Sequence, residues 1–136
     1  MQILETAFSL PVEDLARTHR FYARVFGAEA CTQDADLVTV QAGNMTVFLV
    51  PREQFNLMLK PADTEADFQT GKYTAMLSCT VLTRDEAYAA LKAAADGGGT
   101  PCGQAVSYAW GMAAYFRDPD NHLWEILWRD PRFKAD

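Results

Sequence analysis

The carboxylate of Glu125 is the side chain of this sequence that most needs a chemical explanation. It lies in the apolar run His122 to Trp128, where an isolated charge is costly unless it meets water, a cation or a proton. The preceding Asp118-Pro119-Asp120-Asn121 has the composition of a tight turn, because Pro presets φ and Asn tolerates the left-handed conformation. Residues 115–128 therefore predict a β-hairpin that carries Glu125 on a strand, as a general base or as the anion that orients a ligand.

Hydroxyl groups and a guanidinium are the expected partners of this carboxylate. Either the apolar strand disfavours its charged form, or Arg117 or a hydroxyl of Tyr115, Ser78 or Ser9 keeps it ionised. In both cases we expect Glu125→Gln to be nearly neutral for folding, because the amide keeps the shape of the side chain.

Aromatic residues gather in the same part of the chain. Tyr108, Trp110 and Tyr115 are close in sequence, and alternation along a strand puts Phe48 on the same face as Val50 and Thr46. Aromatic walls around one carboxylate are typical of a pocket for a flat or cationic organic molecule. The alternative is that the tryptophans fill the core and dimer contacts.

The two histidines are weaker candidates for a catalytic role. His19 falls on a helix, where an incidental exposed position is the simpler interpretation, and His122 ends the turn. His122 is expected to have a turn or capping role, with a proton donor near Glu125 as the alternative.

Composition excludes several classes of function. The 136 residues carry a net charge of −6, with 12 basic residues against 18 acidic ones, so no basic surface for nucleic acid is expected. Cys31, Cys79 and Cys102 form no C-x-x-C pair, which predicts reduced thiols. Because the chain has no basic, apolar leader and no long apolar run, we expect a cytoplasmic protein with no membrane partner.

The elements that must position these residues occur twice. A strand is predicted over Leu4–Val12, a helix capped by Asp14 runs to Phe26, and Gly27 ends it. Short strands follow at about 30–32, 36–41 and 45–50, with a hairpin turn at 42–44.

The second half repeats this order. A strand is predicted over 74–81, Thr83 to Glu86 form a capping box that opens a helix, and Gly97-Gly98-Gly99 stops it. Strands follow at about 101–106, 112–116 and 122–128. The sequence thus predicts an α+β fold of two βαβββ modules, 1–50 and 73–136, whose curved mixed β-sheets form a cleft.

Residues 51–72 are predicted to link the modules. The segment is interpreted as a packed linker with one short helix, or as a flap or dimer arm, because the cluster Phe55 to Leu59 is apolar enough to need cover. Together with the apolar helices and Trp128, this cluster predicts a homodimer.

The hairpin Phe116-Arg117-Asp118-Pro119-Asp120 with Glu125, and the opening Leu10-Pro11-Val12-Glu13-Asp14-Leu15 with Phe21-Tyr22 and Phe26-Gly27, resemble the vicinal oxygen chelate superfamily. This superfamily includes glyoxalase I, extradiol dioxygenases, fosfomycin-modifying enzymes and bleomycin-resistance proteins. Trp110-Gly111-Met112 and His122 to Trp128 look most like a branch labelled predicted lactoylglutathione lyases. The resemblance implies the glyoxalase-like fold.

The resemblance also implies where metal ligands would stand. The ligand positions of the superfamily fall at Ala7 and Phe48 in the first module and at Ser78 and Glu125 in the second. One carboxylate is too few for an open catalytic site. We therefore expect no metal cofactor, because these residues are poor ligands for Zn, Ni or Mn.

The sequence leaves three functions open. The first is a glyoxalase-like protein with a largely lost metal site that binds a small organic ligand, such as an antibiotic or aromatic metabolite, through Ala7, Phe48, Ser78, Tyr108, Trp110 and Tyr115 around Glu125. The second is a lyase or isomerase with Glu125 as the catalytic base, with or without a weakly bound divalent ion. A homodimer that serves interaction alone is the third possibility.

Overall fold

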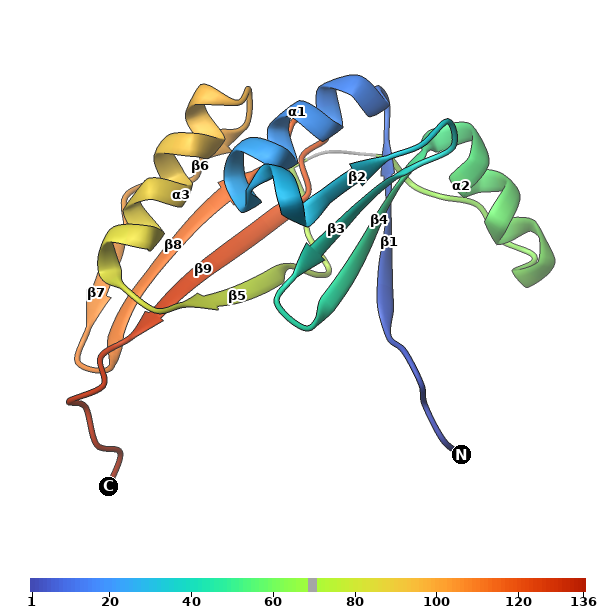
Figure 1. The fold of residues 1–136 in the computed structure, drawn as a ribbon. Helices are drawn as coiled ribbons and strands as arrows, with labels where there is room; N and C mark the ends of the chain where they lie inside the picture. Colours follow the sequence, from blue (N-terminus) through green and yellow to red (C-terminus); the bar gives the residue numbers. More distant parts are fainter. Residues whose placement is uncertain (69–70) are drawn as a thin grey trace. The chain divides into compact units, whose positions relative to one another are not determined.

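A computed structural model of the chain describes residues 1–68 and 71–136 and divides into two compact units, Met1–Thr70 and Gly71–Asp136 (Figure 1). Each unit holds one mixed β-sheet and a long helix, in the order βαβββ in the first unit and in the same order in the second, where two short strands take the place of one. The predicted α+β class is therefore confirmed. Within the described residues, no helix has the length and apolar character needed to cross a bilayer.

The N-terminal sheet is built from β1 (Ala7–Val12), β2 (Cys31–Gln33), β3 (Val38–Ala42) and β4 (Met45–Pro51), with the short helix η1 (Ala28–Ala30) before β2. The strand order is β1-β4-β3-β2, and β1 runs parallel to β4 while the other pairs are antiparallel. The turn Gly43-Asn44 joins β3 to β4, and Gly43 adopts the φ of +60° that this turn requires.

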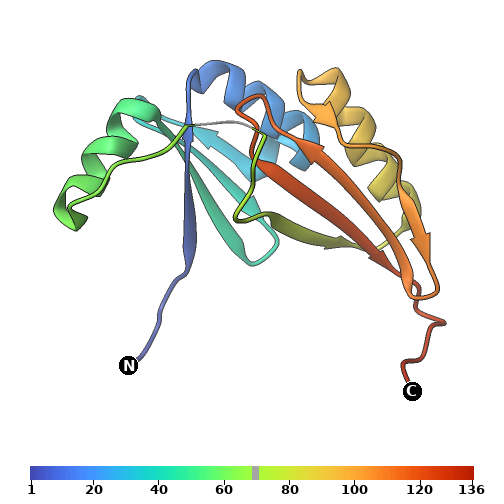
Figure 2. The same cartoon turned by 180° about the vertical axis from the view of Figure 1, so that it is seen from behind.

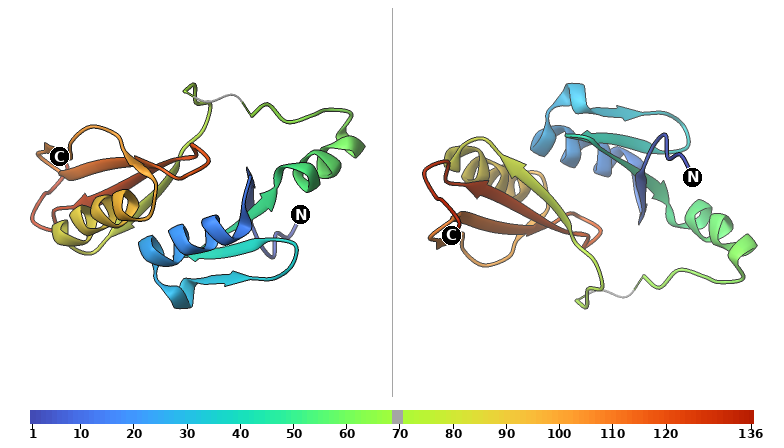
Figure 3. Two further views of the ribbon diagram at one scale, coloured as in Figure 1. Left: turned by 90° about the horizontal axis from the view of Figure 1, so that it is seen from above. Right: turned by 90° about the horizontal axis from the view of Figure 1, so that it is seen from below.

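Helix α1 (Leu15–Phe26) begins and ends where the sequence predicted. The Asp14 side chain accepts a hydrogen bond from the Arg17 backbone N–H at 2.9 Å, and Gly27 ends the helix with φ of +98°. Figure 3 shows α1 along one face of its sheet. Phe21 and Tyr22 are fully buried, and they contribute to the core of this module together with Val38, Val40, Val47 and Leu49.

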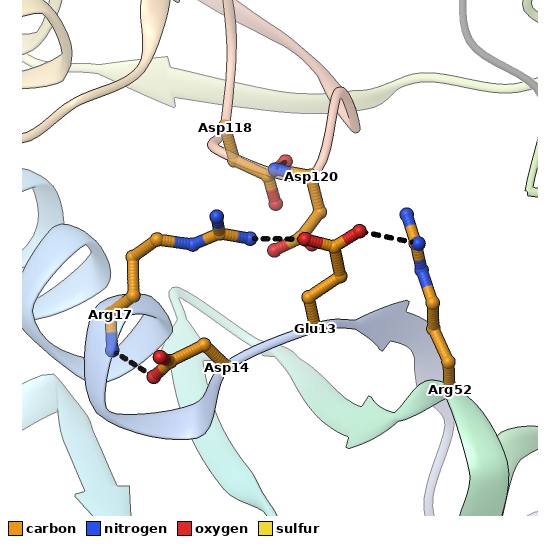
Figure 4. Close-up of polar contacts among 6 residues, drawn as sticks. All are labelled: Glu13, Asp14, Arg17, Arg52, Asp118 and Asp120. Atoms are coloured by element: carbon orange, nitrogen blue, oxygen red, sulfur yellow. Dashed lines mark hydrogen bonds and ion pairs between the residues drawn. The ribbon is translucent and has the colours of Figure 1, made fainter.

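Helix α2 (Arg52–Leu59) follows β4 directly and contacts β1 and β4 (Figure 2). Its first residue, Arg52, donates a hydrogen bond from Nη1 to Glu13 Oε1 at 2.6 Å, and Arg17 Nη2 lies 3.7 Å from Glu13 Oε2 (Figure 4). The Arg52 guanidinium also lies over the Phe68 ring, 4.9 Å from its centre. The start of α2 is therefore tied to the end of β1.

The predicted linker 51–72 contains this one helix, followed by the short helix η2 (Lys60–Ala62). Residues 69 and 70 of the predicted linker lie outside the described residues. Because α2 packs on the N-terminal sheet, the first part of the segment belongs to the compact unit that ends at Thr70.

The C-terminal sheet consists of β5 (Leu77–Val81), β6 (Thr100–Pro101), β7 (Val106–Tyr108), β8 (Gly111–Arg117) and β9 (Leu123–Arg129). The order is β5-β9-β8-β6, with β7 also paired to β8, and β5 runs parallel to β9. This arrangement matches that of the N-terminal sheet, so the internal repeat read from the sequence is present in the topology.

Helix α3 (Arg84–Asp96) covers one face of this sheet (Figure 3). The predicted capping box is present: Thr83 Oγ1 accepts from the Glu86 N–H at 3.2 Å, and Glu86 Oε2 accepts from the Thr83 N–H at 2.9 Å. The module's core contains the fully buried Ala87, Ala94, Met112, Phe116 and Trp124.

Three predicted strands were wrong in extent. β1 begins at Ala7 instead of Leu4, and β5 begins at Leu77 instead of Thr74. The single strand predicted over 101–106 is two short strands, β6 and β7. Pro101 has no N–H for the ladder, and Gly103 takes a left-handed φ of +69°, so the chain leaves β8 and returns to it.

Candidate functional site

The β8–β9 turn sets the position of Glu125. The Asp118 carboxylate accepts hydrogen bonds from the backbone N–H groups of Asp120 at 2.9 Å and His122 at 2.8 Å, and Asn121 adopts a left-handed φ of +68°. This is the turn that the sequence predicted, and His122 takes part through its backbone. The turn fixes the register of β8 and β9, in which Tyr115 lies opposite Glu125.

Strand alternation separates Glu125 from the core. Its neighbours Trp124 and Ile126 are buried, at 0% and 2% exposed, in the core of the module. Glu125 is half-buried on the opposite face of the sheet. Ser78 on β5 and Tyr115 on β8 flank it in register, so the three side chains share what we call the Glu125 face.

Both carboxylate oxygens of Glu125 accept a hydroxyl hydrogen bond. Tyr115 Oη donates to Oε2 at 2.6 Å, and Ser78 Oγ donates to Oε1 at 2.8 Å. The bond to Glu125 raises the pKa of Tyr115 to about 12, with smaller contributions from burial, from the negative charge of Glu125 and from electrostatic interaction with Tyr108. A carboxylate has about four lone-pair positions, so Glu125 can still accept hydrogen bonds from a ligand.

The aromatic residues Tyr108 and Trp110 lie in the β7–β8 hairpin. Their rings stack with centres 5.0 Å apart and planes 6° from parallel, and the Arg129 guanidinium lies 5.9 Å from the centre of the Trp110 ring. Gly111 follows with φ of +150°, and a Cβ at this position would lie 1.9 Å from the carbonyl oxygen of Trp128. The glycine therefore lets the hairpin approach β9 closely enough for these contacts.

Ala7 and Phe48 belong to the N-terminal sheet. Ala7 is exposed at the start of β1, opposite Thr46, whereas Phe48 is half-buried and lies opposite Ser9. Phe48 also lines a pocket of about 300 Å³.

The registers correct the sequence analysis, which placed the first-strand ligand positions of the two modules at Ala7 and Ser78. Phe48 on β4 and Glu125 on β9 are the ligand positions on the last strand of each module. Ser9 on β1 lies opposite Phe48, and Ser78 on β5 lies opposite Glu125. Ser9 and Ser78 also lie five positions before the helix caps Asp14 and Thr83. The counterpart of Ser78 is therefore Ser9.

Arg117, which the sequence offered as a partner of Glu125, lies on β8 two residues from Tyr115, and hydrogen bonding to Tyr73, followed by electrostatic interaction with Cys102, raises its pKa. Sequence reasoning missed several residues near these positions. Asp36, Gln54 and Met58 line the pocket at Phe48. The sequence carried a signal for Asp36. Asp34, two residues earlier, is typical of a turn in which an Asp side chain accepts hydrogen bonds from the following backbone N–H groups, so a turn at Asp36 could have been predicted.

The residues around Glu125 do not fit a divalent metal ion. Within the described part of the chain, no three His, Cys, Asp or Glu side chains are grouped as metal ligands. The side chains that contact Glu125 are two neutral hydroxyls with their protons directed at the carboxylate. Such donors compete with a cation for the same oxygens, and a site for a catalytic ion commonly has three protein ligands.

Known structures share this fold. A hypothetical protein from S. aureus is similar with a TM-score of 0.76 and 22% identity, covering 93% of this chain and 95% of that one. A glyoxalase-related enzyme from Fulvimarina pelagi is similar with a TM-score of 0.77 and 20% identity, covering 100% and 94%. The fosfomycin resistance protein FosX from Mesorhizobium loti is similar with a TM-score of 0.67 and 15% identity, covering 96% of both chains. No curated protein matches significantly.

The two mixed sheets, each with a βαβββ order, define a protein with the glyoxalase-like fold. The model of the glyoxalase/bleomycin resistance protein/dioxygenase superfamily matches residues 3–126. The chain belongs to this superfamily, as the hairpin and the opening strand and helix indicated.

Proposed function

We propose that this chain binds a small organic molecule at the Glu125 face, without a tightly held metal ion. The observation that carries the proposal is the pair of hydroxyl hydrogen bonds from Tyr115 and Ser78, which hold the half-buried Glu125 carboxylate in one orientation. An oriented carboxylate away from the helix-covered core favours recognition of a ligand more than stabilisation of the fold.

The chemistry of this face favours a ligand that is flat and carries N–H donors or a positive charge. Glu125 supplies the negative charge and retains unused lone pairs, while Tyr115 and Tyr108 supply aromatic surface. Tyr108 is 48% exposed, and it stacks on Trp110, so the hairpin can present an aromatic surface with little loss of side-chain entropy. An aromatic metabolite or an antibiotic with an amine or amidine group has this character.

The alternative is a lyase or isomerase in which Glu125 removes a proton from the bound molecule, with or without a weakly held divalent ion. The hydrogen bond of 2.6 Å from Tyr115 Oη to Glu125 Oε2 favours this enzymatic alternative, because it places the hydroxyl proton of Tyr115 next to the carboxylate that would act as the base. Exchange of substrate C–H for deuterium in D₂O would distinguish catalysis from binding alone.

A thermal-shift screen with aromatic amines and amidines, followed by calorimetry, tests the proposal. Hits should bind the wild-type protein and lose at least tenfold in affinity with Glu125→Gln, because one charge-assisted interaction contributes about 1.5 to 3 kcal/mol. Glu53→Gln, an exposed carboxylate in the first turn of α2, is the matched control and should bind as the wild type does. Equal binding by wild type and Glu125→Gln would contradict the proposal.

A further inference from the structure

The Glu125 face carries a second charged side chain, the guanidinium of Arg117. Phe116 is fully buried in the core of the module, so its neighbours Tyr115 and Arg117 on β8 point to the opposite face of the sheet, where Glu125 lies. Tyr115 is directly opposite Glu125. Arg117 is therefore the diagonal neighbour of Glu125, at a Cα distance of about 7 to 8 Å, which long side chains and a small ligand can span.

These two opposite charges do not pair with each other. Both carboxylate oxygens of Glu125 accept hydrogen bonds from hydroxyl groups. The Arg117 guanidinium instead donates side-chain hydrogen bonds to Tyr73 and Cys102. Within the described residues, the contacts of Arg117 include no carboxylate. An anion and a cation thus lie on one face of the sheet, and each is bound by hydroxyl or thiol groups.

The guanidinium of Arg117 also has hydrogen-bonding capacity that its contacts do not use. Arg117 is half-buried, and its Nε atom is enclosed by protein without a hydrogen-bond partner among the described residues. A buried N–H group without a partner is disfavoured, so its presence in a folded protein needs an explanation. A guanidinium has five N–H donors in a planar fork that matches a carboxylate, and two hydrogen bonds leave donors for such a group. Arg117 can therefore bind an anion.

We infer that Arg117 binds an anionic group of the ligand, so that the ligand of the Glu125 face is a zwitterion with a flat body. Its ammonium or amidinium group contacts Glu125, and its carboxylate contacts Arg117. The inference rests on the proposed function, because it assigns the second charge of the same ligand.

A zwitterion fits this face better than a ligand with one charge. A cation bound at Glu125 is repelled by the nearby Arg117, and an anion bound at Arg117 is repelled by Glu125, whereas a zwitterion gains at both positions. The ring of Tyr115 is a neighbour of both residues and supplies a surface for the flat body. Arg129 is less suited to this role, because it lies four residues from Glu125 along β9, about 13 Å away, and stacks on Trp110.

Ligand-observed NMR titrations with three compounds of similar shape test the inference. The zwitterion is p-aminomethylbenzoate, whose two charges are separated by one ring. Benzylammonium lacks the carboxylate, and p-toluate lacks the ammonium group. We expect the wild-type protein to bind the zwitterion at least about fivefold more tightly than either compound with one charge, because both of its charged groups find a charged partner.

Opposite effects of two substitutions make the test specific. Arg117→Gln should weaken binding of p-aminomethylbenzoate and p-toluate about five- to twentyfold, and it should leave benzylammonium bound as tightly or more tightly, because a repelling charge is removed. Glu125→Gln should have the reverse effects on benzylammonium and p-toluate. Arg117→Lys keeps the charge and should recover most of the lost affinity, which a purely structural role of the guanidinium would not allow. Arg20→Gln removes the same charge at an exposed position of α1 and should leave all three affinities unchanged.

Equal affinity of the wild-type protein for p-aminomethylbenzoate and benzylammonium, or equal affinities of Arg117→Gln and Arg20→Gln for the zwitterion, would overturn the inference. If benzylammonium binding still depended on Glu125 in that case, the proposed function would stand without it. Binding of p-toluate that depends on Arg117, with benzylammonium indifferent to Glu125→Gln, would instead contradict the proposed function and keep Arg117 as an anion-binding residue. Absence of binding by all three compounds would overturn the inference, whereas the screen of amines and amidines tests the proposed function separately.

Discussion

Tyr115 donates its hydroxyl proton to Glu125 Oε2 across a β8–β9 pair in direct register, at 2.6 Å. The carboxylate therefore stabilises the neutral phenol, and the pKa of Tyr115 rises from 10.0 to about 12. A charge-assisted bond of this length is among the stronger polar contacts of a protein. It links the candidate ligand-binding carboxylate to the aromatic residue beside it.

We predict that one tyrosine titrates with a pKa of about 12 in a spectrophotometric titration of the native protein. Because the folded pKa is raised above the unfolded value of 10.0, the stabilisation by this pair is complete below pH 10 and is lost as the pH rises toward 12. Tyr115→Phe should remove the late titration. Glu125→Gln should return the pKa toward the ordinary value of 10.0, and an unchanged late transition in that variant would contradict the assigned cause.

We predict that Glu125→Gln changes the free energy of unfolding by less than about 1 kcal/mol near neutral pH, since the amide still accepts a hydroxyl hydrogen bond and only the charge is lost. Urea denaturation followed by circular dichroism measures this. A loss above about 3 kcal/mol would mean that Glu125 belongs to a buried structural ion pair, and the assignment of a ligand site would then fail.

Local chemistry explains how much of this site was predictable. The turn at Asp118 to Asn121, the cap at Asp14 and the box at Thr83 each depend on residues within four positions, so the sequence predicted them correctly. The hydroxyls of Ser78 and Tyr115 were named as possible partners of Glu125, and the structure selects them from a larger set.

Long-range relationships were less predictable. The correspondence of Ser78 with Ser9 depends on strand register, and the two halves share too little sequence to fix it. The pocket at Phe48 requires α2 to pack back on β1 and β4, a tertiary contact that no local pattern encodes. The break between β6 and β7 was missed because Pro101 and Gly103 were assigned to a strand interior.

We predict weak metal binding. Calorimetry with Ni²⁺, Zn²⁺ or Mn²⁺ should show dissociation constants no tighter than roughly 10 μM at the Glu125 face, because one carboxylate with two hydroxyl neighbours offers too few ligands. Stoichiometric binding with a sub-micromolar constant that Glu125→Gln abolishes would contradict both this prediction and the proposed metal-free mode.

Gly111→Ala should destabilise the protein by more than about 2 kcal/mol, because backbone strain and a steric collision add at this position. Gly111 has a φ of +150°, and the new Cβ would collide with the backbone of Trp128. Gly103→Ala is the control. Gly103 also has a positive φ, +69°, but a Cβ there meets no atom within 4 Å, so it reports the backbone strain without the collision. Thermal unfolding of the two variants compares them, and equal losses would show that the close approach to Trp128 is unimportant.

The exposed apolar surface of the chain indicates self-association. Exposed apolar side chains remain in both modules, including Leu57 at 44%, Met58 at 54% and Leu82 at 89%. Association would cover part of this surface. We therefore expect a homodimer, and equilibrium sedimentation at tens of micromolar measures it.

Trp110→Ala should leave the dimer intact and weaken ligand binding at the Glu125 face by about 1 to 3 kcal/mol through lost stacking and buried area. The cause is that Tyr108 loses the ring on which it stacks, with centres 5.0 Å apart. Trp128→Phe is the matched control, since Trp128 contacts Arg84 of α3, which lies outside the site that we assign. Unchanged ligand affinity in Trp110→Ala would contradict the role of Trp110 in binding. A monomeric wild-type protein would contradict the predicted homodimer.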